Sequence, residues 1–456
     1  MSNILCIGAG YVGGPTMAMI AKNCPEHKIT VVDINQERID CWNSDDLPIY
    51  EPGLLDVVRL ARGRNLFFQT DVAQAITDAE IIFVSVNTPT KMFGEGAGKA
   101  ADLQFWEKTA RDILDNCRKP NVIVVEKSTL PVRTAEAMAK IFQLGKSSTK
   151  FSVVSNPEFL AEGTAIEDLT NPDRVLIGGE QNEIGRKAAE TVAELYAHWV
   201  PRENILLTNV WSSELSKLVA NAMLAQRVSS INSISALCER TEADIEEVSK
   251  AIGMDTRIGA KFLEASIGFG GSCFSKDILH LSYLCEYYGL QEVADYWASV
   301  VHINEWQIDR FFQKILHEQF DTLAGKTITM LGFAFKQDTG DTRDSPAIQL
   351  CKKLLGEHAK VRIHDPKALE NARIDLKEMQ GDVSFEEDVY KALEGAHVLA
   401  LVTQWAEYRE LDFERIYNKM VKPAFVFDGR NHLEHEKLFE IGFNVFPLGK
   451  APLKQV

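Results

Sequence analysis

A short apolar strand that runs directly into a glycine loop constrains the fold of this chain more than any other feature. Ile4–Ile7 are apolar, Gly8-Ala9-Gly10-Tyr11-Val12-Gly13 follow at once, and the next residues to about Lys22 have helical character. Lys28–Asp33 has the composition of a second strand, and it ends in an acid about 20 residues after the loop. This order predicts a βαβ unit whose two strands run parallel.

The spacing of the glycines and the acid indicates a dinucleotide site. Gly8 permits the tight turn, Gly10 lets a pyrophosphate approach the main chain, and Gly13 allows close helix packing. Asp33 would bind the ribose hydroxyls and repel a 2′-phosphate, so the expected cofactor is NAD rather than NADP. Arg38 is the nearby residue that could instead tolerate that phosphate.

Further apolar segments repeat the βαβ pattern in two parts of the chain. In the first part we predict strands at Ile81–Val86, Val122–Glu126 and Phe151–Ser155. After about Leu323 the pattern returns with predicted strands at Thr327–Gly332, Val361–Asp365, Val398–Val402 and Ala424–Asp428. The second part lacks the glycine fingerprint and has Gly332-Phe333-Ala334-Phe335-Lys336 in its place, so its ligand should differ.

Between these parts, Ser212 to about Leu237 has the pattern of one long helix. Its predicted apolar face consists of Leu215, Leu218, Val219, Ala222 and Met223. Thr241 with Asp244 resembles a capping box that would open another helix. A long apolar helix offers either a dimer surface or ordinary intramolecular packing.

We therefore predict an α/β fold with two Rossmann-like, doubly wound parallel-sheet domains joined by a central long helix or helical domain. The expected boundaries are residues 1–210 for the NAD-binding domain and 211–322 for a central region with dimerisation and catalytic-cysteine roles. Residues 323–456 form the second nucleotide-type domain.

Composition excludes several other classes of protein. The net charge of −16 leaves no general basic surface for nucleic acid or an anionic membrane. The apolar runs stay well short of the roughly 20 residues of a membrane span. Eight scattered cysteines without a CxxC pair suggest neither disulfides nor a zinc cluster, and the histidines show no pattern beyond His432 and His435, so we predict no metal. The glycine motif begins too early for a cleavable signal, and we expect a cytoplasmic protein.

The segment Gly268–Asp277 indicates a nucleophile. Its glycines let a ligand approach the main chain, and Ser272 is expected to cap a helix. Cys273 would then lie at a helix N-terminus, where unpaired N–H groups favour a thiolate. Asp277 follows one turn later, with Lys276 beside it as a possible cation. The alternative is that Cys273 is a small buried hydrophobe, as most free cysteines are.

Other polar residues occur where open α/β sheets bind ligands. Lys217 and Asn221 share one face of the long helix, and a lysine among apolar neighbours is costly unless it serves a ligand or catalysis. Asn156–Gly163 follows the predicted strand Phe151–Ser155, and its acids Glu158 and Glu162 are candidates for water handling or cofactor contact. Glu126-Lys127-Ser128-Thr129 has the equivalent place after another strand.

An NAD site and a reactive cysteine on one chain suggest oxidation beyond the aldehyde. A hydride cannot leave an aldehyde carbon until a nucleophile has added. Cys273 would form a thiohemiacetal, a hydride would pass to NAD, and the resulting thioester would hydrolyse to a carboxylate.

At this point the motifs resemble the UDP-glucose 6-dehydrogenases, within the nucleotide-sugar dehydrogenase family, in their animal-like form. The resemblance extends over essentially the whole chain. It is carried by Gly8–Thr16, Asn87-Thr88-Pro89-Thr90, Glu126–Thr129, Asn156–Gly163, Gly268–Asp277 and Gly332–Arg343. It implies an enzyme that oxidises UDP-glucose twice at C6, giving UDP-glucuronate and two NADH.

The resemblance also implies a role for each site residue. Cys273 is the expected nucleophile, Lys217 and Asp277 move protons through water, and Lys217 stabilises the oxyanion. The implied catalytic set is Cys273, Lys217, Asp277, Glu158, Thr129 and Asn221, with Glu158 and Thr129 positioning or activating water. The implied cofactor set is Gly8, Gly10, Tyr11, Val12, Gly13, Asp33, Arg38, Ser128, Thr129, Glu162, Cys273, Lys276 and Arg343. The implied substrate set is Glu158, Phe159, Leu160, Ala161, Glu162, Lys217, Asn221, Arg257, Phe262, Leu263, Phe269, Gly270, Phe335, Lys336 and Arg430.

Arg257 matches an arginine that reaches the substrate of a neighbouring subunit, which implies a homo-oligomer of at least two chains. The animal-like form implies a hexamer built from dimers, whereas bacterial relatives are often dimers, and the sequence leaves the choice between them open. Glu264 departs from the pattern, because a lysine is expected there, and this puts a charge contact at that position in doubt.

Two alternatives stay open on the sequence alone. The same chemistry could act on UDP-N-acetylglucosamine, UDP-N-acetylmannosamine or GDP-mannose. A regulator that binds NAD and a nucleotide but senses redox state through its cysteine is the alternative from another class.

Overall fold

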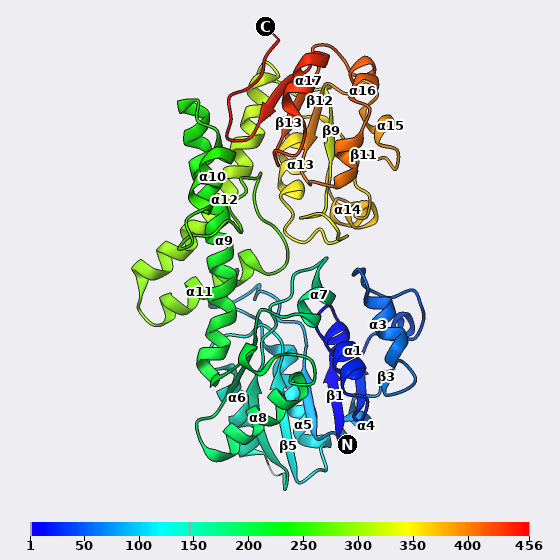
Figure 1. The fold of residues 1–456 in the computed structure, drawn as a ribbon, viewed down its shortest axis with the longest axis vertical. Coiled ribbons are helices and arrows are strands. Elements are labelled where there is room, and N and C mark those ends of the chain that lie inside the picture. The colour runs from blue at the N-terminus through cyan, green and yellow to red at the C-terminus, as the bar shows by residue number, and fades with distance from the viewer. Residues whose placement is uncertain (1, 146, 456) are drawn as a thin grey trace. The chain divides into compact units, whose positions relative to one another are not determined.

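The computed structural model of the chain describes residues 2–145 and 147–455. These residues divide into two compact units, Met1–Ala220 and Asn221–Val456, called here unit 1 and unit 2. Each unit contains one β-sheet with helices around it (Figure 1). The two units are described separately below.

Unit 1 is built on an eight-stranded sheet with the order β3-β2-β1-β4-β5-β6-β7-β8. The strands β1 to β6 are parallel, but β7 pairs antiparallel with β6, and β8 is parallel to β7. The expectation of a parallel sheet therefore holds for the first six strands only. The bounds are β1 Asn3–Ile7, β2 Lys28–Val32, β3 Leu66–Gln69, β4 Ile81–Val84, β5 Asn121–Glu126, β6 Lys150–Ser155, β7 Val175–Gly179 and β8 Ile205–Asn209.

Alternate side chains of β1 face two different hydrophobic cores, which is why helices cover both faces of the sheet. Ile4 and Cys6 lie in one core with α1, α2, α3, α7 and α8, whereas Leu5 and Ile7 lie in the other with α4, α5 and α6. A strand buried on both faces has a continuous apolar run, as in Ile4–Ile7 of β1. The helices are α1 Gly13–Asn23, α2 Gln36–Trp42, α3 Leu54–Ala61, α4 Val72–Thr77, α5 Gln104–Asn116, α6 Thr134–Leu144, α7 Ala165–Thr170 and α8 Glu183–Tyr196, with a short 3₁₀ helix at Arg202–Asn204.

The predicted long helix is α9, Val210–Thr241, which runs from unit 1 into unit 2. Leu218 and Ala222 of its predicted apolar face are fully buried, but Leu215 and Met223 are 39% and 51% exposed. The predicted capping box is wrong, because Thr241 is the last residue of α9 and its hydroxyl donates to the Leu237 carbonyl. Asp244 alone caps the next helix by accepting from the amide of Glu246 at 2.8 Å.

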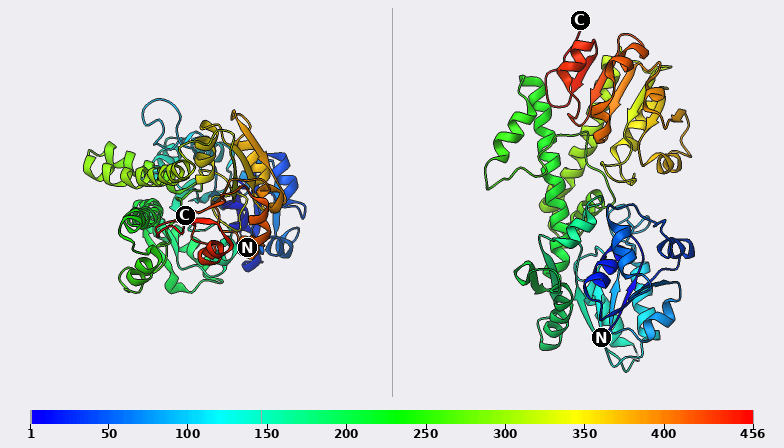
Figure 2. Two further views of the ribbon diagram at one scale, coloured as in Figure 1. Left: turned by 90° about the horizontal axis from the view of Figure 1, so that it is seen from above. Right: turned by 45° about the vertical axis from the view of Figure 1, so that its right-hand side comes forward.

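Helices make up the first half of unit 2. They are α10 Ile245–Gly253, α11 Phe274–Tyr287 and α12 Gln291–Glu318. The helices α11 and α12 pack against each other as a hairpin (Figure 2). Their shared core includes Ile278, Leu281 and Val300, together with Ala222 and Ala225 of α9.

The second sheet has six strands, all parallel, in the order β11-β10-β9-β12-β13-β14. This is the 3-2-1-4-5-6 order of a doubly wound dinucleotide fold, and β1 to β6 of unit 1 repeat it. The strands are β9 Thr327–Leu331, β10 Lys360–His364, β11 Asp382–Phe385, β12 Val398–Leu401, β13 Phe425–Asp428 and β14 Asn444–Pro447. The helices are α13 Pro346–Gly356, α14 Leu369–Asp375, α15 Val389–Leu393, α16 Phe413–Lys419 and α17 His435–Ile441, with a 3₁₀ helix at Ala406–Glu410.

In the described part of the chain, every helix is too short or too polar to cross a lipid bilayer.

Candidate functional site

The glycine loop between β1 and α1 has the geometry that a bound pyrophosphate requires. Gly8 has a φ of +108°, and a Cβ there would lie 2.2 Å from the Ser85 carbonyl oxygen. A Cβ on Gly13 would lie 2.1 Å from the Gly8 carbonyl oxygen, so α1 can pack this closely only on glycine. A Cβ on Gly10 would instead meet no protein atom within 4 Å. The loop is therefore rigid on its inner side and open at Gly10, which fits a dinucleotide phosphate.

Asp33 at the end of β2 ties this loop to the sheet. Its Oδ2 atom accepts from the Ala9 amide at 3.0 Å and from the Arg38 guanidinium at 2.9 Å. Burial alone would raise the pKa of Asp33, but these hydrogen bonds and that of Asn35 hold it below its ordinary value. Arg38 thus pairs with Asp33, and an anionic group at Asp33 would meet a carboxylate. This geometry fits the preference for NAD.

Tyr11 and Val12 complete the loop, and an unexpected residue supports it. Val12 is the N-cap position of α1, and the Tyr11 hydroxyl donates to the buried carboxylate of Glu51. Glu51 also accepts from the Gly163 amide at 2.5 Å and the Ala165 amide at 3.2 Å. It thereby joins the glycine loop to the loop that carries Glu162. Glu51 lies in an irregular segment without a motif, so this role could not be predicted from the sequence.

Hydrogen bonds from side-chain hydroxyls to main-chain carbonyls connect the loops after β4 and β5. The Ser128 hydroxyl donates to the Val86 carbonyl at 2.7 Å, and the Thr88 hydroxyl donates to the Thr129 carbonyl at 3.1 Å. Both loops follow the carboxyl ends of adjacent parallel strands. Ser128 and Thr129 therefore lie at the edge of the sheet where this fold class binds ligands.

A buried ion pair joins α9 to the loop after β6. The Lys217 Nζ atom lies 2.9 Å from Glu158 Oε1, and the side chains are 4% and 8% exposed. The Glu158 carboxylate also accepts from the Leu160 amide at 2.6 Å. Burial raises the pKa of Glu158, but Lys217 and this amide outweigh burial and hold it below its ordinary value. Lys217 is therefore a buried lysine held beside an ionised carboxylate.

Aromatic and polar groups surround this pair. The Phe159 ring lies 5.6 Å from the Lys217 ammonium and 3.8 Å from the Arg174 guanidinium. Nearby Lys127 is also buried, and burial lowers its pKa to about 8 despite the attraction of Glu158. The backbone amide of Leu160 donates a hydrogen bond to the Glu158 carboxylate, and that of Ala161 donates to the Asp168 carboxylate. Lys127 was part of a motif in the sequence, but nothing marked Arg174.

In unit 2, Cys273 occupies the N-cap position of α11 and is partly exposed. The expectation that Ser272 caps this helix is wrong, because the helix begins one residue later and the Ser272 hydroxyl lies 3.5 Å from the Cys273 sulfur instead. The consequence for the thiol is unchanged, since Cys273 lies beside the first amides of a 14-residue helix. Lys276, in the first turn of α11, is partly buried.

Asp277 is fully buried one turn after the cysteine. Its Oδ2 atom accepts from the Asn221 side-chain amide at 2.7 Å, and its backbone N–H donates to the Cys273 carbonyl at 2.8 Å. Asn221 follows Lys217 by four residues on α9. The structure thus confirms that one face of α9 carries both Lys217 and Asn221 as buried residues, each hydrogen-bonded to a carboxylate.

The glycine turn before Cys273 is held by α12. Asn304 accepts from the Phe269 amide at 2.8 Å and donates to the Phe269 carbonyl at 3.0 Å. A Cβ on Gly268 would lie 2.9 Å from this same Asn304 oxygen, and Gly271 has a φ of +88°. Asn304 is a buried polar residue on the long helix α12, and no motif in the sequence marks it.

Three of the substrate candidates, Arg430, Phe335 and Lys336, lie at the carboxyl ends of strands of the second sheet. Arg430, just after β13, donates to the carbonyls of Val402 at 2.7 Å and Phe335 at 3.2 Å. Burial lowers the pKa of Arg430 to about 10. A Cβ on Gly270 would lie 2.9 Å from the Phe335 Cβ, so the glycine turn packs on the loop after β9. Lys336 is partly exposed there.

This second loop differs from the first at its acid. Asp365 accepts from the amides of Phe333 and Ala334 and from the Trp405 indole, as well as from two amides of its own turn. Its carboxylate is therefore fully used within the protein. The same position that binds a ribose in a dinucleotide fold is structural in unit 2.

Four further candidates lie in loops of unit 2. Phe262 has a φ of +63° and is 41% exposed, while Leu263 beside it is buried. The Arg257 side chain is 88% exposed and pairs with Asp255 at 2.6 Å. Arg343 is also largely exposed, with its Nε 2.9 Å from Asp341.

The sequence and the fold of the chain are similar to those of known proteins. Sequence models of the UDP-glucose/GDP-mannose dehydrogenase family match the chain in three places: the NAD binding domain at residues 2–200, the central domain at 211–306 and the UDP binding domain at 329–435. UDP-glucose 6-dehydrogenase 5 of Oryza sativa subsp. japonica is 56% identical over 99% of this chain and 97% of its own length. UDP-glucose 6-dehydrogenase 1 of Arabidopsis thaliana is 55% identical with the same coverage.

Among solved structures, a UDP-glucose dehydrogenase from the archaeon Pyrobaculum islandicum is similar to the chain with a TM-score of 0.84 and 30% identity. The match covers 97% of this chain and 98% of that one. A UDP-D-ManNAc dehydrogenase from Pyrococcus horikoshii is similar with a TM-score of 0.80 and 26% identity, over 98% and 99% of the two chains.

Proposed function

Because the chain belongs to the UDP-glucose/GDP-mannose dehydrogenase family, we propose that it oxidises UDP-glucose twice at C6, with NAD as the cofactor, and releases UDP-glucuronate. The relatives at 55–56% identity carry the name UDP-glucose 6-dehydrogenase and cover nearly the whole chain. The structural observation that carries the proposal is Cys273 at the N-cap of α11, in a glycine turn and one turn before the buried Asp277.

The residues of unit 1 fit the cofactor. Gly10 leaves open space beside the helix N-terminus of α1, and Gly8, Tyr11, Val12 and Gly13 form the rest of the loop. When bound, NAD accepts one hydride in each oxidation. Asp33 with Arg38 would hold the adenosine ribose, and Ser128, Thr129 and Glu162 are the further contacts of this unit that we assign to it.

The second oxidation requires a covalent bond to the enzyme. The Cys273 thiolate adds to the C6 aldehyde, and the carbonyl oxygen takes up a proton to give a thiohemiacetal. Loss of a hydride from C6 and of the hydroxyl proton converts it to a thioester. Water then adds to the thioester carbon, the C–S bond breaks, and the products are the carboxylate, the Cys273 thiol and a proton.

Lys217, Asp277, Glu158, Thr129 and Asn221 support these steps. The Lys217 ammonium would stabilise negative charge that develops on the C6 oxygen, because a buried cation acts more strongly than a solvated one. Asp277 would accept and return protons through water, and Asn221 fixes its carboxylate by donating at 2.7 Å. Glu158 and Thr129 would position the attacking water.

We assign the nucleotide half of the substrate to unit 2. Arg430, Phe335 and Lys336 lie at the carboxyl ends of the second sheet, and Phe262, Leu263, Phe269 and Gly270 belong to the chain segment that ends at Cys273. The exposed Arg257 would reach a substrate on a neighbouring subunit, which requires a homo-oligomer of at least two chains. The proposed assembly is a hexamer built from three such dimers. The cysteines of the described residues form no disulfide, which fits a reducing compartment, and we place the protein in the cytoplasm.

A substrate panel tests the choice of sugar. NADH production is measured with UDP-glucose, UDP-N-acetylglucosamine, UDP-N-acetylmannosamine and GDP-mannose at matched concentrations, and the product is identified by mass spectrometry. The expected result is a kcat/KM for UDP-glucose at least about 100-fold above the others. A preference for another sugar would overturn the substrate, and NAD binding without turnover of any sugar would favour the redox-sensor alternative.

A further inference from the structure

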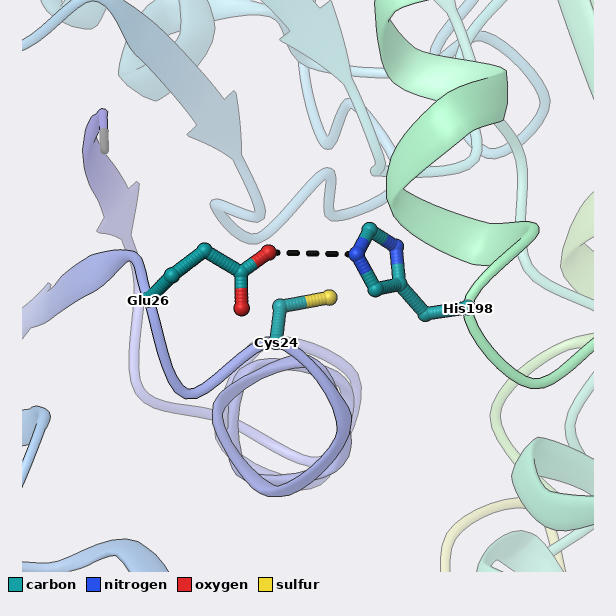
Figure 3. Close-up of side chains that lie close together, drawn as sticks. All are labelled: Cys24, Glu26 and His198. Carbon is teal, nitrogen blue, oxygen red and sulfur yellow. Dashed lines mark ion pairs between the residues drawn. The ribbon is translucent and has the colours of Figure 1, made fainter.

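Three chemically distinct side chains of unit 1 converge at a point that the proposed reaction does not use. The Cys24 sulfur, a Glu26 carboxylate oxygen and a His198 ring nitrogen all lie within 4.8 Å of one another (Figure 3). Cys24 is the C-cap of α1, Glu26 lies in the turn before β2, and His198 lies just after α8. Glu26 precedes β2, whereas Asp33 follows it. The cluster and Asp33, the carboxylate proposed to bind the ribose, are therefore at opposite ends of this strand.

The orientation of His198 makes its second nitrogen an electron-pair donor. Its Nδ1 atom lies 2.9 Å from the Glu194 carbonyl oxygen and 3.2 Å from that of Leu195. A carbonyl oxygen can only accept, so Nδ1 carries the proton. In the neutral ring Nε2 then holds a lone pair, and it lies 3.1 Å from Glu26 Oε1. At this distance the two atoms are joined either by a proton on Nε2 or by a metal ion bound to both of them. A backbone carbonyl on the far nitrogen is the support that metal-binding histidines usually have.

A second histidine orients the carboxylate. His27 Nδ1 accepts from the Ser2 amide at 3.0 Å, so in the neutral ring its Nε2 carries the proton. This Nε2 lies 3.3 Å from the same Glu26 oxygen. The Cys24 sulfur lies 3.5 Å from the Leu195 carbonyl, which His198 also approaches. The end of α8 thus organises both the thiol and the imidazole.

The donor set selects the kind of ion. A thiol, an imidazole and a carboxylate are the ligands that Zn²⁺ takes, whereas Mg²⁺ and Ca²⁺ require oxygen ligands. Tetrahedral zinc with bonds of about 2.0–2.3 Å keeps its ligand atoms about 3.3–3.6 Å apart. The 3.1 Å separation of His198 Nε2 and Glu26 Oε1 is close to this value, and the Cys24 sulfur lies within 4.8 Å of both atoms.

We propose that Cys24, Glu26 and His198 bind one Zn²⁺ per chain, with water as the fourth ligand. Binding would release the thiol proton of Cys24 to solvent and form a sulfur–zinc bond. The ion would tie the turn between α1 and β2 to the end of α8, segments that are 172 residues apart in the sequence. Its role is structural, because the ligands lie away from the glycine loop and Asp33.

Zinc binding to the full chain tests this site without any use of catalytic activity. The chelator-treated protein is titrated with Zn²⁺ and Co²⁺, while thermal unfolding and the cobalt absorption spectrum are recorded. The expected results are one equivalent of metal, a higher unfolding temperature and a thiolate-to-cobalt charge-transfer band. His198→Gln, at a half-exposed side chain, should weaken binding by at least about tenfold. Cys24→Ser should remove the charge-transfer band.

Two control variants separate this site from adventitious binding. His317→Gln removes another histidine that faces a carboxylate, Asp321 at 3.1 Å, and Cys41→Ser removes a partly exposed thiol outside the cluster. Both should bind metal as the wild type does. The proposal fails if the wild type takes up no stoichiometric zinc, if the cobalt complex lacks a thiolate band, or if His198→Gln binds as tightly as His317→Gln.

Discussion

Cys273 differs from most cysteines of the chain in both exposure and place. Six of the eight are buried, and only Cys41 and Cys273 are partly exposed. Cys41 lies within α2, whereas Cys273 lies at the start of α11 after a glycine turn clamped by Asn304. The combination of access, helix N-terminus and a buried neighbouring acid is what the proposed covalent chemistry needs.

Replacement of the nucleophile should separate the two oxidations. The Cys273→Ser variant should still carry out the first oxidation, from the C6 alcohol to the aldehyde. The second oxidation should be slow, because a hydroxyl is a far poorer nucleophile than a thiolate. The rate of UDP-glucuronate formation should therefore fall by more than about 10³-fold. Quenched-flow analysis of the products measures this directly. Cys41→Ser serves as the matched thiol control and should keep full activity, and full activity of Cys273→Ser would remove the assigned nucleophile.

The buried Lys217–Glu158 pair yields a second prediction at the same scale. Glu158→Gln takes the carboxylate away from a lysine that is 4% exposed, and the loss of one partner from a buried pair costs about 3–5 kcal/mol of unfolding free energy. The double variant Glu158→Leu, Lys217→Met should recover most of this stability while staying inactive. Urea unfolding and NADH production are the measurements. Equal stability of Glu158→Gln and the wild type would show that the pair is not coupled.

At the scale of elements, the loop between β1 and α1 separates folding from cofactor binding. A Cβ on Gly14 would lie 2.1 Å from the Trp42 ring, whereas a Cβ on Gly10 would meet nothing within 4 Å. Gly14→Ala should therefore cost about 1–3 kcal/mol in the protein without cofactor. Gly10→Ala should change stability by less than about 0.5 kcal/mol.

The same pair of variants has a binding readout. Gly10→Ala should weaken NADH binding by about tenfold or more, because its methyl group occupies the space of the pyrophosphate. Fluorescence titration with NADH and urea unfolding give both quantities. A Gly10→Ala variant with wild-type NADH affinity would place the dinucleotide elsewhere.

The predictability of the elements followed from how strongly each one is patterned. Strands such as β1, β5 and β12 have an apolar run of at least four residues because both faces are buried there, and their positions were predicted within two residues. The strands β3, β7, β8, β11 and β14 were missed. Exposure accounts for two of them, since β8 has two exposed leucines and β11 has no fully buried residue. The strands β7 and β14 are fully buried but short, and they end in glycine and proline, which weaken a strand pattern. The reversal of β7 depends on the path of the chain after Asn156–Gly163, which no local pattern records.

The site was predictable where chemistry requires a fixed spacing. Asp277 and Asn221 were singled out by four-residue helical spacings, and their contact with each other at 2.7 Å joins two helices. Glu51, Asn304 and Arg174 were not found, because each supports the site from a segment without a motif. The Cys24, Glu26 and His198 cluster likewise depends on tertiary contact between distant segments.

At the scale of the whole molecule, two doubly wound sheets of the same strand order carry different loops. The first loop is open at Gly10, while the second is closed by Asp365 and three further groups of its own unit. The repetition supplies two nucleotide-type units, and the difference in their loops fits one for NAD and one for a sugar nucleotide.

A buried carboxyl pair makes the stability of unit 1 depend on pH. Burial, reinforced by the charge of Glu214, raises the pKa of Glu126 well above its ordinary value, and burial raises the pKa of Glu214 to about 7. The folded state thus holds protons that the unfolded state releases above about pH 4.5, so stability falls as pH rises from there through about 7. We expect a loss of about 1–3 kcal/mol over this window.

Glu126→Gln should remove the part of that loss that comes from Glu126, because an amide carries no proton to release, whereas Glu214 keeps the part that its own burial causes. Urea unfolding at pH 5 and pH 8 measures the difference, and hydrogen exchange at β5 assigns it to this site. Glu107→Gln, at an exposed carboxylate paired with Arg111, should keep the wild-type slope. An unchanged slope in Glu126→Gln would contradict the assignment.

The ratio of NADH formed to UDP-glucose consumed tests the central proposal most directly. With excess NAD and a limiting, known amount of UDP-glucose, the reaction is run to completion, and NADH is read by absorbance while the sugar nucleotides are quantified by chromatography. A four-electron oxidation through Cys273 predicts two NADH and one UDP-glucuronate for each UDP-glucose. A ratio of one, with the aldehyde as the final product, would contradict it.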